Sequence, residues 1–528
     1  MNEKDPISKH IFLFPFRWDV KKGNIFENSG ISMEDYEKEL KTLGWKDEEY
    51  YNNNIDHLDY NEFQYFYPFV RDALYDFNVK NENIIRHLEY PTNVDTDSYT
   101  ITFSKNEKIR SIELKVKFLL LNLYTTGIGI ISYQLWNDSY PDFEDILAIN
   151  EFGRRVYPPY CTENFNLDHV RSNLIAQNIR LKVGLSVYED DFNDFLDDDN
   201  RNAVLRNEEQ KLPDYIVNLL ISPQNKDVTI QPILDDRMFV ICWYKGDEKV
   251  TPELWREEVN HKNEHCYGYT NSEQWYKYVY IDAHVASVHN KVLRYEQLNA
   301  STYARFIEYK YEGKPSPTIY GITRYSMVSY SSDSFLIGNH TMTIYYKMIE
   351  LCLVQRASIV HFSSMVSQTT NLFNQKEDFD KEEVKKRIDK LYRDYIRFIN
   401  KFYIREITHQ EQGIEMYNMM MNSMNIHNQI KELDDEIAEL HQYANTIEQQ
   451  KQTEQANRIS LLAYLFLPAT LMFGIFGANF YIEKEWQIGN EVDGNAVTWI
   501  IIGLSPSILF AFFNRRKIVD ILKNIRFK

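Results

Sequence analysis

Two uncharged runs near the C-terminus constrain the fold of this chain more than any other feature of its sequence. Residues 459–480 and 496–513 contain no charged side chain, whereas 26% of the 528 residues are charged. A helix rises about 1.5 Å per residue, so the runs would span roughly 33 Å and roughly 27 Å, against a hydrocarbon layer of ~30 Å. We therefore expect a transmembrane helix in each run. A helical hairpin in a soluble core is the alternative, and it is disfavoured because neither run is amphipathic.

The charges around these runs predict their orientation. Arg458 precedes the first run and a basic tail at 514–528 follows the second, whereas the loop at 481–495 is acidic. The positive-inside rule then places both termini in the cytoplasm and the loop outside. A third apolar stretch, at 344–362, is interrupted by Lys347, Glu350 and Arg356, so we expect a buried helix of the water-soluble part there.

The first run also carries a motif. The stretch "FLPATLMFGIFGANF" resembles the first membrane helix of the CorA-type divalent-cation channels. The positions in register with that family are Phe466, Pro468, Thr470, Gly474, Ile475, Gly477, Asn479 and Phe480. One position departs from the family pattern, because Ala478 stands where the family usually has Met. The resemblance covers the C-terminal part of the chain only.

This resemblance implies an α/β cytosolic domain, a long stalk helix and a C-terminal two-helix transmembrane hairpin, assembled as a homopentamer in the bacterial inner membrane. It implies that Gly477, Ala478 and Asn479 form the ion entry, since carboxamide oxygens can accept hydrogen bonds from the water shell of a small divalent ion. A stripe at helical spacing would line the pore, namely Ile459, Ala463, Leu467, Thr470 and Gly474. Ordinary packing against lipid or a neighbouring helix is the alternative for the stripe.

The segment before the runs has the spacing of a coiled coil. Apolar residues alternate at intervals of four and three, namely Ile426, Ile430, Leu433, Ile437, Leu440, Ala444 and Ile447. We therefore expect a coiled-coil stalk within a helical region at 341–458. Residues 384–402 repeat the pattern, so this segment is expected to pack back along the stalk.

The N-terminal part, 1–340, reads as an α/β regulatory domain. Residues 112–118 alternate apolar and charged side chains, turn at Thr126 and Gly127, and continue as a second strand. Further strands are expected at 180–188, 228–234, 238–244 and 276–281. The net charge of -18 argues against a nucleic-acid polymer as partner. No catalytic constellation is recognisable, so we do not expect an enzyme.

Two stretches of this domain are candidate ligand sites. In "EFGRRVYPPYC", Arg154 and Arg155 offer forked donors for phosphate, and Tyr157 and Tyr160 offer ring faces for a base. An arginine pair that meets acidic neighbours is the alternative.

The second stretch, 188–200, is acidic and could sense a divalent cation such as Mg²⁺, as acidic sites between subunits do in CorA-type channels. Its candidate residues are Asp190, Asp191, Asp194, Asp197, Asp198 and Asp199. Their spacing matches no calcium loop, so a solvated acidic loop is the alternative.

The resemblance and these sites together favour one hypothesis. The chain would be a CorA-like oligomeric membrane channel for divalent cations, gated by a ligand of its cytosolic domain. Its long N-terminal region, Ala478 and the Gly-Arg-Arg stretch resemble the CRISPR-associated branch of CorA-like proteins, which implies an adenine-nucleotide messenger of antiviral defence as the ligand. A housekeeping transporter of magnesium or another divalent metal, gated by intracellular metal, is one alternative. A non-conducting scaffold anchored in the bilayer is the other.

Overall fold

The computed structural model describes residues 5–20, 33–48, 58–75, 84–105, 108–156, 176–192, 212–222, 228–246, 251–259, 263–284, 286–331, 336–374, 381–479 and 505. The chain divides into two compact units. The first comprises Met1–Gln368 and Leu391–Glu436, and the second comprises Thr369–Lys390 and Ile437–Lys528.

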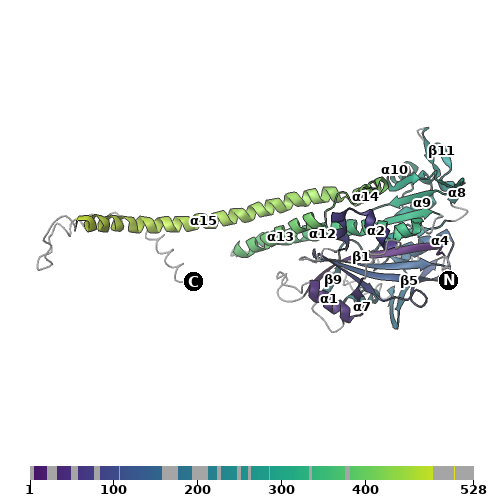
Figure 1. The fold of residues 1–528 in the computed structure, drawn as a ribbon, viewed down its shortest axis with the longest axis horizontal. Coiled ribbons are helices and arrows are strands. Elements are labelled where there is room, and N and C mark those ends of the chain that lie inside the picture. Colours follow the sequence, from purple (N-terminus) through teal and green to yellow (C-terminus); the bar gives the residue numbers. More distant parts are fainter. Residues whose placement is uncertain are drawn as a thin grey trace, which may run out of the picture. The chain divides into compact units, whose positions relative to one another are not determined.

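The first unit is built on one large mixed sheet (Figure 1). Among the described residues thirteen strands join it, in the order β13-β16-β17-β10-β1-β6-β5-β4-β7-β8, with β9 beside β1, β3 beside β5 and β2 beside β3. Neighbours are antiparallel except β10 and β17, which are parallel. The strands are β1 (Ser8–Val20), β2 (Lys46–Asp47), β3 (Ile85–Tyr90), β4 (Ser98–Lys105), β5 (Lys108–Tyr124), β6 (Ile128–Asn137), β7 (Asn178–Val183), β8 (Ser186–Asp191), β9 (Val228–Pro232), β10 (Phe239–Tyr244), β13 (Thr302–Phe306), β16 (Thr318–Ile322) and β17 (Ser326–Ser331). Two small hairpins, β11 (Glu257–Val259) with β12 (His265–Tyr267) and β14 (Lys310–Tyr311) with β15 (Lys314–Pro315), stand apart from it.

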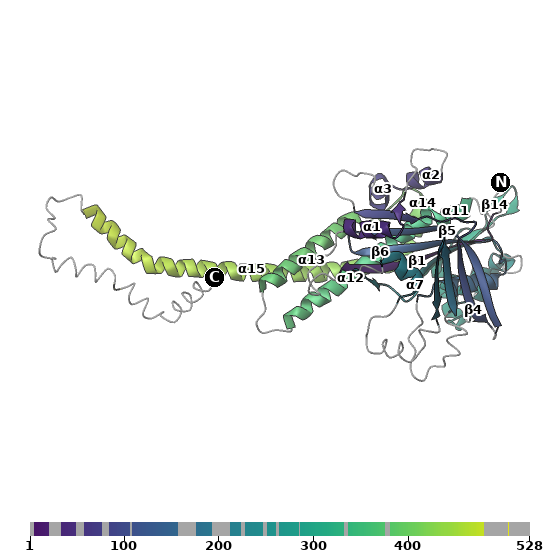
Figure 2. The same ribbon diagram turned by 90° about the horizontal axis from the view of Figure 1, so that it is seen from below.

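The central strand β1 contains a proline, which usually excludes a residue from the middle of a sheet because proline has no N–H to donate. One edge of β1 pairs with β6 along most of its length. The other edge pairs with β10 from Ser8 to Leu13 and with β9 from Phe16 to Val20. Pro15 therefore lies where that edge changes partner, at a gap between two ladders. Figure 2 shows β1 beside β6 in the sheet.

The predicted hairpin at 112–137 is confirmed as β5 and β6. Burial alternates along β5 until Val116, as the sequence indicates. A register shift between Val116 and Phe118 then ends the alternation and leaves Phe118 39% exposed. Beyond this shift residues 119–124 are all buried, because helices cover both faces of the sheet there.

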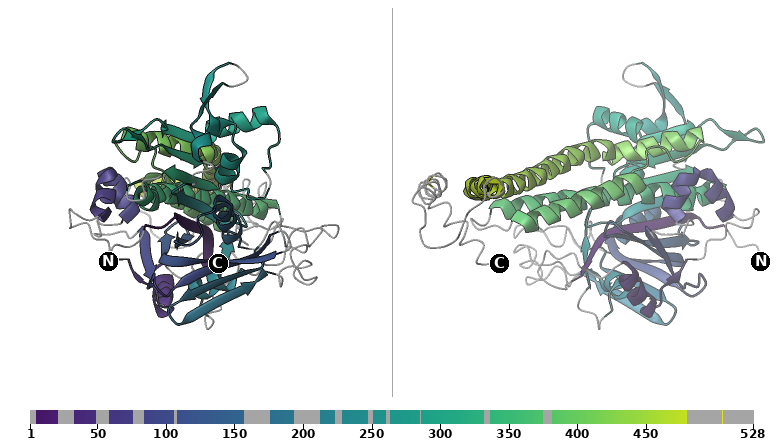
Figure 3. Two further views of the ribbon diagram at one scale, coloured as in Figure 1. Left: turned by 90° about the vertical axis from the view of Figure 1, so that its right-hand side faces the viewer. Right: turned by 60° about the vertical axis from the view of Figure 1, so that its left-hand side comes forward.

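Helices cover the two faces of the sheet (Figure 3). On one face, α12 packs against β5 and β6, where Tyr346 shares a hydrogen bond with Ser132. On the other face, Tyr133 donates a hydrogen bond to the carbonyl of Tyr215 in α7. The helices are α1 (Met33–Thr42), α2 (Leu58–Tyr65), α3 (Pro68–Tyr75), α4 (Phe143–Gly153), α7 (Asp214–Leu220), α8 (Thr251–Leu254), η2 (Gly268–Thr270), α9 (Glu273–Tyr280), α10 (Lys291–Ser301), α11 (Leu336–Met342), α12 (Ile344–Asn374), α13 (Lys381–Lys401), α14 (Glu411–Ser423) and α15 (Ile426–Asn479).

Two predictions about local structure have opposite outcomes. The buried helix expected at 344–362 is the first part of α12 and is confirmed. The strand expected at 276–281 is wrong, since these residues belong to α9 and the turn after it. Ser272 begins α9 by accepting a hydrogen bond from the backbone N–H of Trp275. The aromatic residues that suggested a strand instead form a buried helical face.

The second unit contains an antiparallel helix pair. Val384 and Ile388 of α13 pack with Leu440 and Ala444 of α15. Lys385 and Glu448 form an ion pair of 3.1 Å across the pair. The seam predicted for the stalk is buried in this unit, as Ile437 and Ala444 show. The expectation that residues 384–402 pack back along the stalk is confirmed for Val384 and Ile388.

The predicted membrane architecture is wrong. Within the described ranges, no helix combines the length and apolar character that crossing a membrane requires. Residues 459–479 of the first run are the end of α15, whereas the loop at 481–495, the second run at 496–513 apart from Ser505, and the tail at 514–528 lie outside the described residues. The sequence argument rested on the length and lack of charge of the two runs, on the charges that flank them and on the motif in the first run. A membrane hairpin also needs a second helix packed on the first. Of the two uncharged runs, only the first lies in a helix that the structure describes.

This finding corrects three predictions together. The CorA-like fold class, the membrane and channel assignments, and the location in a bacterial inner membrane all required a spanning hairpin. What the described residues contain is the large mixed sheet with its covering helices.

Candidate ligand-binding site

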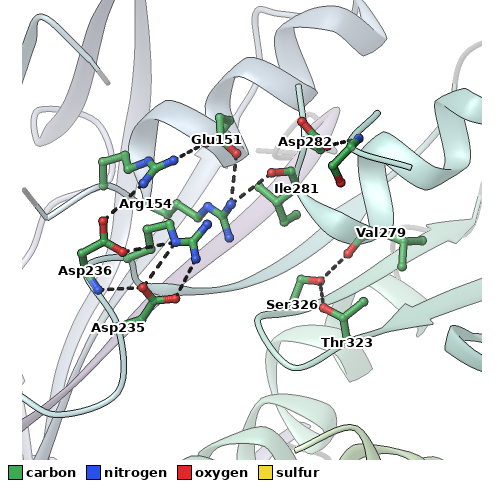
Figure 4. A network of polar contacts seen from close by, with 12 residues as sticks. Glu151, Arg154, Asp235, Asp236, Val279, Ile281, Asp282, Thr323 and Ser326 are labelled. Carbon is green, nitrogen blue, oxygen red and sulfur yellow. Dashed lines mark hydrogen bonds and ion pairs between the residues drawn. The ribbon is translucent and has the colours of Figure 1, made fainter. Parts of the chain in front are cut away.

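The arginine pair predicted to bind a nucleotide follows α4 directly. The carboxylate of Glu151 forms ion pairs of 3.0 Å with both Arg154 and Arg155 (Figure 4). Arg154 also donates a hydrogen bond to the carbonyl of Ile281, and Arg155 lies 3.4 Å from Asp236. Both guanidinium groups are buried and each already has a carboxylate partner.

In this network the charges of the two arginines are balanced by those of Glu151 and Asp236. Burial acts to raise the pKa of Glu151, but the charges of Arg154 and Arg155 outweigh it and hold that pKa below its ordinary value. Burial and a hydrogen bond with Asp235 raise the pKa of Asp236 to about 6. Tyr157 and Tyr160, the proposed base-stacking residues, lie outside the described residues.

The acidic stretch is only partly described. The carboxylate of Asp190 accepts hydrogen bonds from the backbone N–H groups of Asp214, at 2.8 Å, and Tyr215, at 3.2 Å. Asp191 ends β8, and Asp194, Asp197, Asp198 and Asp199 lie outside the described residues. Across the ranges that the structure covers, no group of three or more His, Cys, Asp or Glu side chains is arranged to hold a metal ion.

The predicted pore stripe lies on the last turns of α15. The side chains of Ile459 and Leu467 are 67% and 64% exposed, and a Cβ added at Gly474 would meet no atom within 4 Å. Ala463 and Thr470 are likewise exposed. Gly477, Ala478 and Asn479 are the final residues of the helix.

A site that the sequence analysis missed lies in the first unit, between α3 and the segment that joins α13 to α14. We call this segment, residues 402–410, the connector. A cavity of about 510 Å³ opens between them. Its lining residues are Phe69, Ala73, Ile84, Asn400, Lys401, Tyr403, Ile404, Arg405 and Glu406.

The connector is fixed on its inner side. The side chains of Phe402, Ile404 and Ile407 are buried. Its backbone is tied to the rest of the unit, since Ile407 accepts a hydrogen bond from the N–H of Tyr67 at 2.9 Å. Gln355 of α12 donates to the carbonyl of Phe402 at 3.0 Å. The outward side chains, which face the cavity, therefore project from a rigid backbone.

Two cations on this wall have no acidic partner. Lys401 and Arg405 form no ion pair with any residue that the structure describes, and the guanidinium of Arg405 lies 5.4 Å from the ring centre of Tyr403. The one carboxylate of the lining, Glu406, accepts a hydrogen bond from the hydroxyl of Tyr67 at 2.8 Å. The cavity therefore has a positive wall.

An aromatic face completes the cavity. Phe69 stacks on Tyr67 with ring centres 5.8 Å apart, and its side chain remains 58% exposed. A flat exposed ring beside two cations suits a planar ligand that carries negative charge. The sequence signal was the stretch "KFYIRE" at 401–406, in which cations flank aromatic and apolar residues, but its partner Phe69 is far away in the chain.

The comparisons with known proteins do not extend this description. No protein-family model matches the chain, and no curated protein matches it. The kinship with CorA-type channels accordingly stays a prediction from the motif.

Proposed function

We propose that this chain is a non-catalytic effector controlled by a small aromatic phosphate, such as an adenine mononucleotide, that binds in the cavity between α3 and the connector. One observation carries the proposal. Lys401 and Arg405, two cations without an acidic partner in the described residues, share the wall of a roughly 510 Å³ cavity with the exposed ring of Phe69. Arg and Lys donors hold a phosphate, and an aromatic ring holds the face of a base.

The size of the cavity supports a ligand of this class. Small-molecule sites commonly enclose roughly 300–1,000 Å³ and combine apolar walls with a few polar groups. Here Ala73, Ile84 and Ile404 supply the apolar wall, and the amide of Asn400 supplies a donor and an acceptor. A mononucleotide would place its base against Phe69 and its phosphate between the two cations.

The position of the cavity supports a regulatory role. The connector continues into α13 on one side and, through α14, into α15 on the other. A ligand that contacts both α3 and the connector would favour the conformation in which these are apposed, in proportion to its differential affinity for that conformation. Binding would thus bias the ends of the helices that continue into the second unit. The channel expected from the resemblance forms no part of this proposal, because it required the spanning hairpin.

The direct test is calorimetric titration of the full chain with adenosine 5′-monophosphate. Lys401→Gln and Arg405→Gln are each expected to weaken binding about tenfold, near 1.4 kcal/mol, since each removes a charge-assisted hydrogen bond to phosphate. Phe69→Ala should weaken the nucleotide but not inorganic phosphate. Arg393→Gln, which removes an exposed cation two turns earlier on α13, is the matched control. Equal affinity in the Lys401, Arg405 and Arg393 variants would exclude the cavity as the site.

A second measurement tests the regulatory part. Hydrogen exchange of the full chain with and without the nucleotide should show slower exchange in the connector and at the end of α13. The nucleotide should be recovered unchanged after incubation, because the proposal assigns no chemistry to the site. Hydrolysis or transfer of its phosphate would contradict the non-catalytic assignment.

A further inference from the structure

A second cationic site lies in the same unit, around the turn between β16 and β17. Arg324 and Tyr325 belong to this turn, Arg237 precedes β10, and Arg356 projects from α12. The guanidinium carbons of Arg237 and Arg356 lie 5.3 Å and 5.6 Å from the ring centre of Tyr325. We call Arg237, Arg324, Tyr325 and Arg356 the arginine–tyrosine cluster.

The positive charge of the cluster is not balanced locally. Arg237 pairs with Asp235 at 3.0 Å and with Asp236 at 3.4 Å. Arg324 and Arg356 form no ion pair with any residue in the described ranges. The two carboxylates nearest in sequence are thus engaged by Arg237, and Asp236 also meets Arg155. The cluster holds more guanidinium groups than carboxylate partners.

Arg356 has fewer hydrogen-bond acceptors around it than its guanidinium has N–H donors. It is only 4% exposed, and its guanidinium donates a hydrogen bond of 3.2 Å to the carbonyl of Arg324 and also hydrogen-bonds with the side chain of Tyr325. The Nε atoms of Arg324 and Arg356 are buried without any hydrogen-bond acceptor. Burial and the charge of Arg324 lower the pKa of Arg356, and they outweigh the smaller raising effects of Tyr325 and Asp235. A buried cation beside a like charge, with donors unmet, is costly unless an anion joins it.

The turn that presents the cluster is held from several sides. Thr323 and Ser326 share a hydroxyl hydrogen bond of 2.6 Å, and the N–H of Tyr325 donates to the Thr323 hydroxyl at 3.2 Å. The hydroxyl of Ser326 donates to the carbonyl of Val279 (Figure 4). The carbonyl of Tyr325 accepts from Val240 at 3.1 Å. The backbone of the turn is therefore fixed, which lowers the entropic cost of ordering it when a ligand binds.

We propose that the arginine–tyrosine cluster is a binding site for a tetrahedral phosphoryl dianion, held by the forked donors of Arg324 and Arg356 beside the ring of Tyr325. A tetrahedral oxyanion offers enough acceptor oxygens for two guanidinium forks, which a single carboxylate does not. The site is separate from the cavity between α3 and the connector, because it uses the turn after β16 and the middle of α12. Its phosphoryl group can come from free phosphate or from a phosphate monoester.

Titration calorimetry of the full chain with inorganic phosphate, at constant ionic strength, tests the site. Saturable binding is expected, with at least a tenfold loss of affinity in Arg324→Gln and in Arg356→Met. Arg305→Gln, which removes an arginine paired with Glu411 and Glu415, is the control and should bind as the parent does. Phosphate affinity that is equal in all four proteins, or no saturable binding, would overturn the proposal.

The two sources and the two sites can be told apart. Repeating the titration with adenosine 5′-monophosphate on Lys401→Gln and on Arg356→Met separates them: loss only in Arg356→Met assigns the monoester to the cluster and removes the cavity from the proposed function. Loss only in Lys401→Gln leaves free phosphate as the ligand of the cluster.

Thermal unfolding distinguishes a phosphate-binding arginine from one with a purely structural role, because the two roles predict different changes in unfolding temperature. Without phosphate, Arg356→Met should unfold at a temperature equal to or above that of the parent, because it removes an unpaired buried charge. Phosphate should raise the unfolding temperature of the parent and not of the variant. A variant that is less stable in phosphate-free buffer assigns Arg356 to the packing of α12 and contradicts the proposal. Arg324→Gln, at a half-buried position on the turn, repeats the test with little change to the core.

Discussion

Several buried polar residues of the first unit form hydrogen bonds with one another, and the series that includes His10 is an example. Asn137 donates to the hydroxyl of Ser8 at 2.9 Å, and Ser8 contacts the Nε2 atom of His10 at 2.8 Å. The Nδ1 atom of His10 lies 2.7 Å from the amide oxygen of Asn150, so that nitrogen carries the proton and donates it. His10 is fully buried, and burial lowers its pKa to about 4.

This depressed pKa predicts a pH dependence of stability. A histidine takes up a proton near pH 6.5 when unfolded and near pH 4 here, so its contribution is complete above about pH 6.5 and is lost as the pH falls toward 4. The loss amounts to about 3 kcal/mol by linkage. Denaturant unfolding at several pH values should show a shallower decline for His10→Gln than for the parent, and an unchanged decline for His409→Gln at an exposed position. If the stability of His10→Gln declined with falling pH as steeply as that of the parent, a group other than His10 would be responsible for the decline.

Charged residues inside an apolar run were informative at this scale. Lys347, Glu350 and Arg356 marked the run at 344–362 as part of a water-soluble fold, and each proves to be buried in a polar contact. Lys347 lies 3.3 Å from Glu350, which also accepts from Tyr124 at 3.0 Å. Burial acts to lower the pKa of Lys347, but Glu350 and smaller contributions from neighbouring acidic groups together outweigh it, and the pKa is raised. The contact of Glu350 with Tyr124 was not predictable, because Tyr124 is more than two hundred residues away in the chain.

At the scale of elements, the short helix α7 depends on a residue of another element. Its N-cap is Pro213, whose side chain has no oxygen to accept a hydrogen bond. Asp190 of β8 takes this role, and its carboxylate accepts the N–H groups of Asp214 and Tyr215. A carboxylate at this end of a helix also meets the positive end of the helix dipole. Asp190, which was a candidate residue of a cation sensor, therefore caps the N-terminus of α7.

Replacing Asp190 by Ala should therefore destabilise the first unit. The expected loss is about 1–2 kcal/mol, the usual cost of removing a cap acceptor. Asp191→Ala, at an exposed neighbouring position, is the control for the loss of a negative charge. Urea unfolding of the two variants measures the difference. Equal stability of the two would mean that water replaces the carboxylate at α7 without cost.

Predictions of single elements were correct where the pattern of apolar and polar residues distinguishes a strand from a helix. Alternation at 112–118 predicted β5 because one face of the strand is exposed there, so the pattern is visible in the residues. At 276–281 the aromatic residues all seek burial, and a strand and an amphipathic helix then share the same composition. The signal that separates them, the cap at Ser272, stands before the segment.

At the scale of the whole molecule, the chain leaves and re-enters the first unit. The segments Thr369–Lys390 and Ile437–Lys528 form the second unit, whose helix pair has a small apolar contact of Val384, Ile388, Leu440 and Ala444. The ion pairs beside it, such as Lys451 with Glu382 at 3.1 Å, lie on the surface and contribute little. The pairing of these helices thus rests on few buried side chains.

Ile388→Ala should open this pair without loosening the sheet. Ile388 is 1% exposed, and its truncation is expected to cost about 2–4 kcal/mol. Hydrogen exchange should accelerate at 381–390 and 437–450, while the strands of the first unit keep their protection. Lys386→Ala, on the exposed side of the same turn, should leave exchange unchanged. Faster exchange in β1 or β6 would show that the two units unfold together.

Both proposed sites join residues that are far apart in the chain, and this is why sequence reasoning did not find them. Phe69 and Arg405 meet only because the connector is tied to Tyr67. Arg356 meets Arg324 only because α12 lies against the turn between β16 and β17. The heptad spacing before residue 459 predicted helices that pack along one another, but spacing alone does not tell whether the partner is another chain or α13.

The place of β1 has a consequence for synthesis. Strand β1 leaves the ribosome before its partners, which are residues 128–137 on one edge and residues 239–244 on the other. At about 5–20 residues per second, a nascent chain needs on the order of tens of seconds to expose the later partner. Until then the apolar strand β1 is unpaired on that edge. Its contacts during this time determine whether the nascent chain folds or aggregates with other nascent chains.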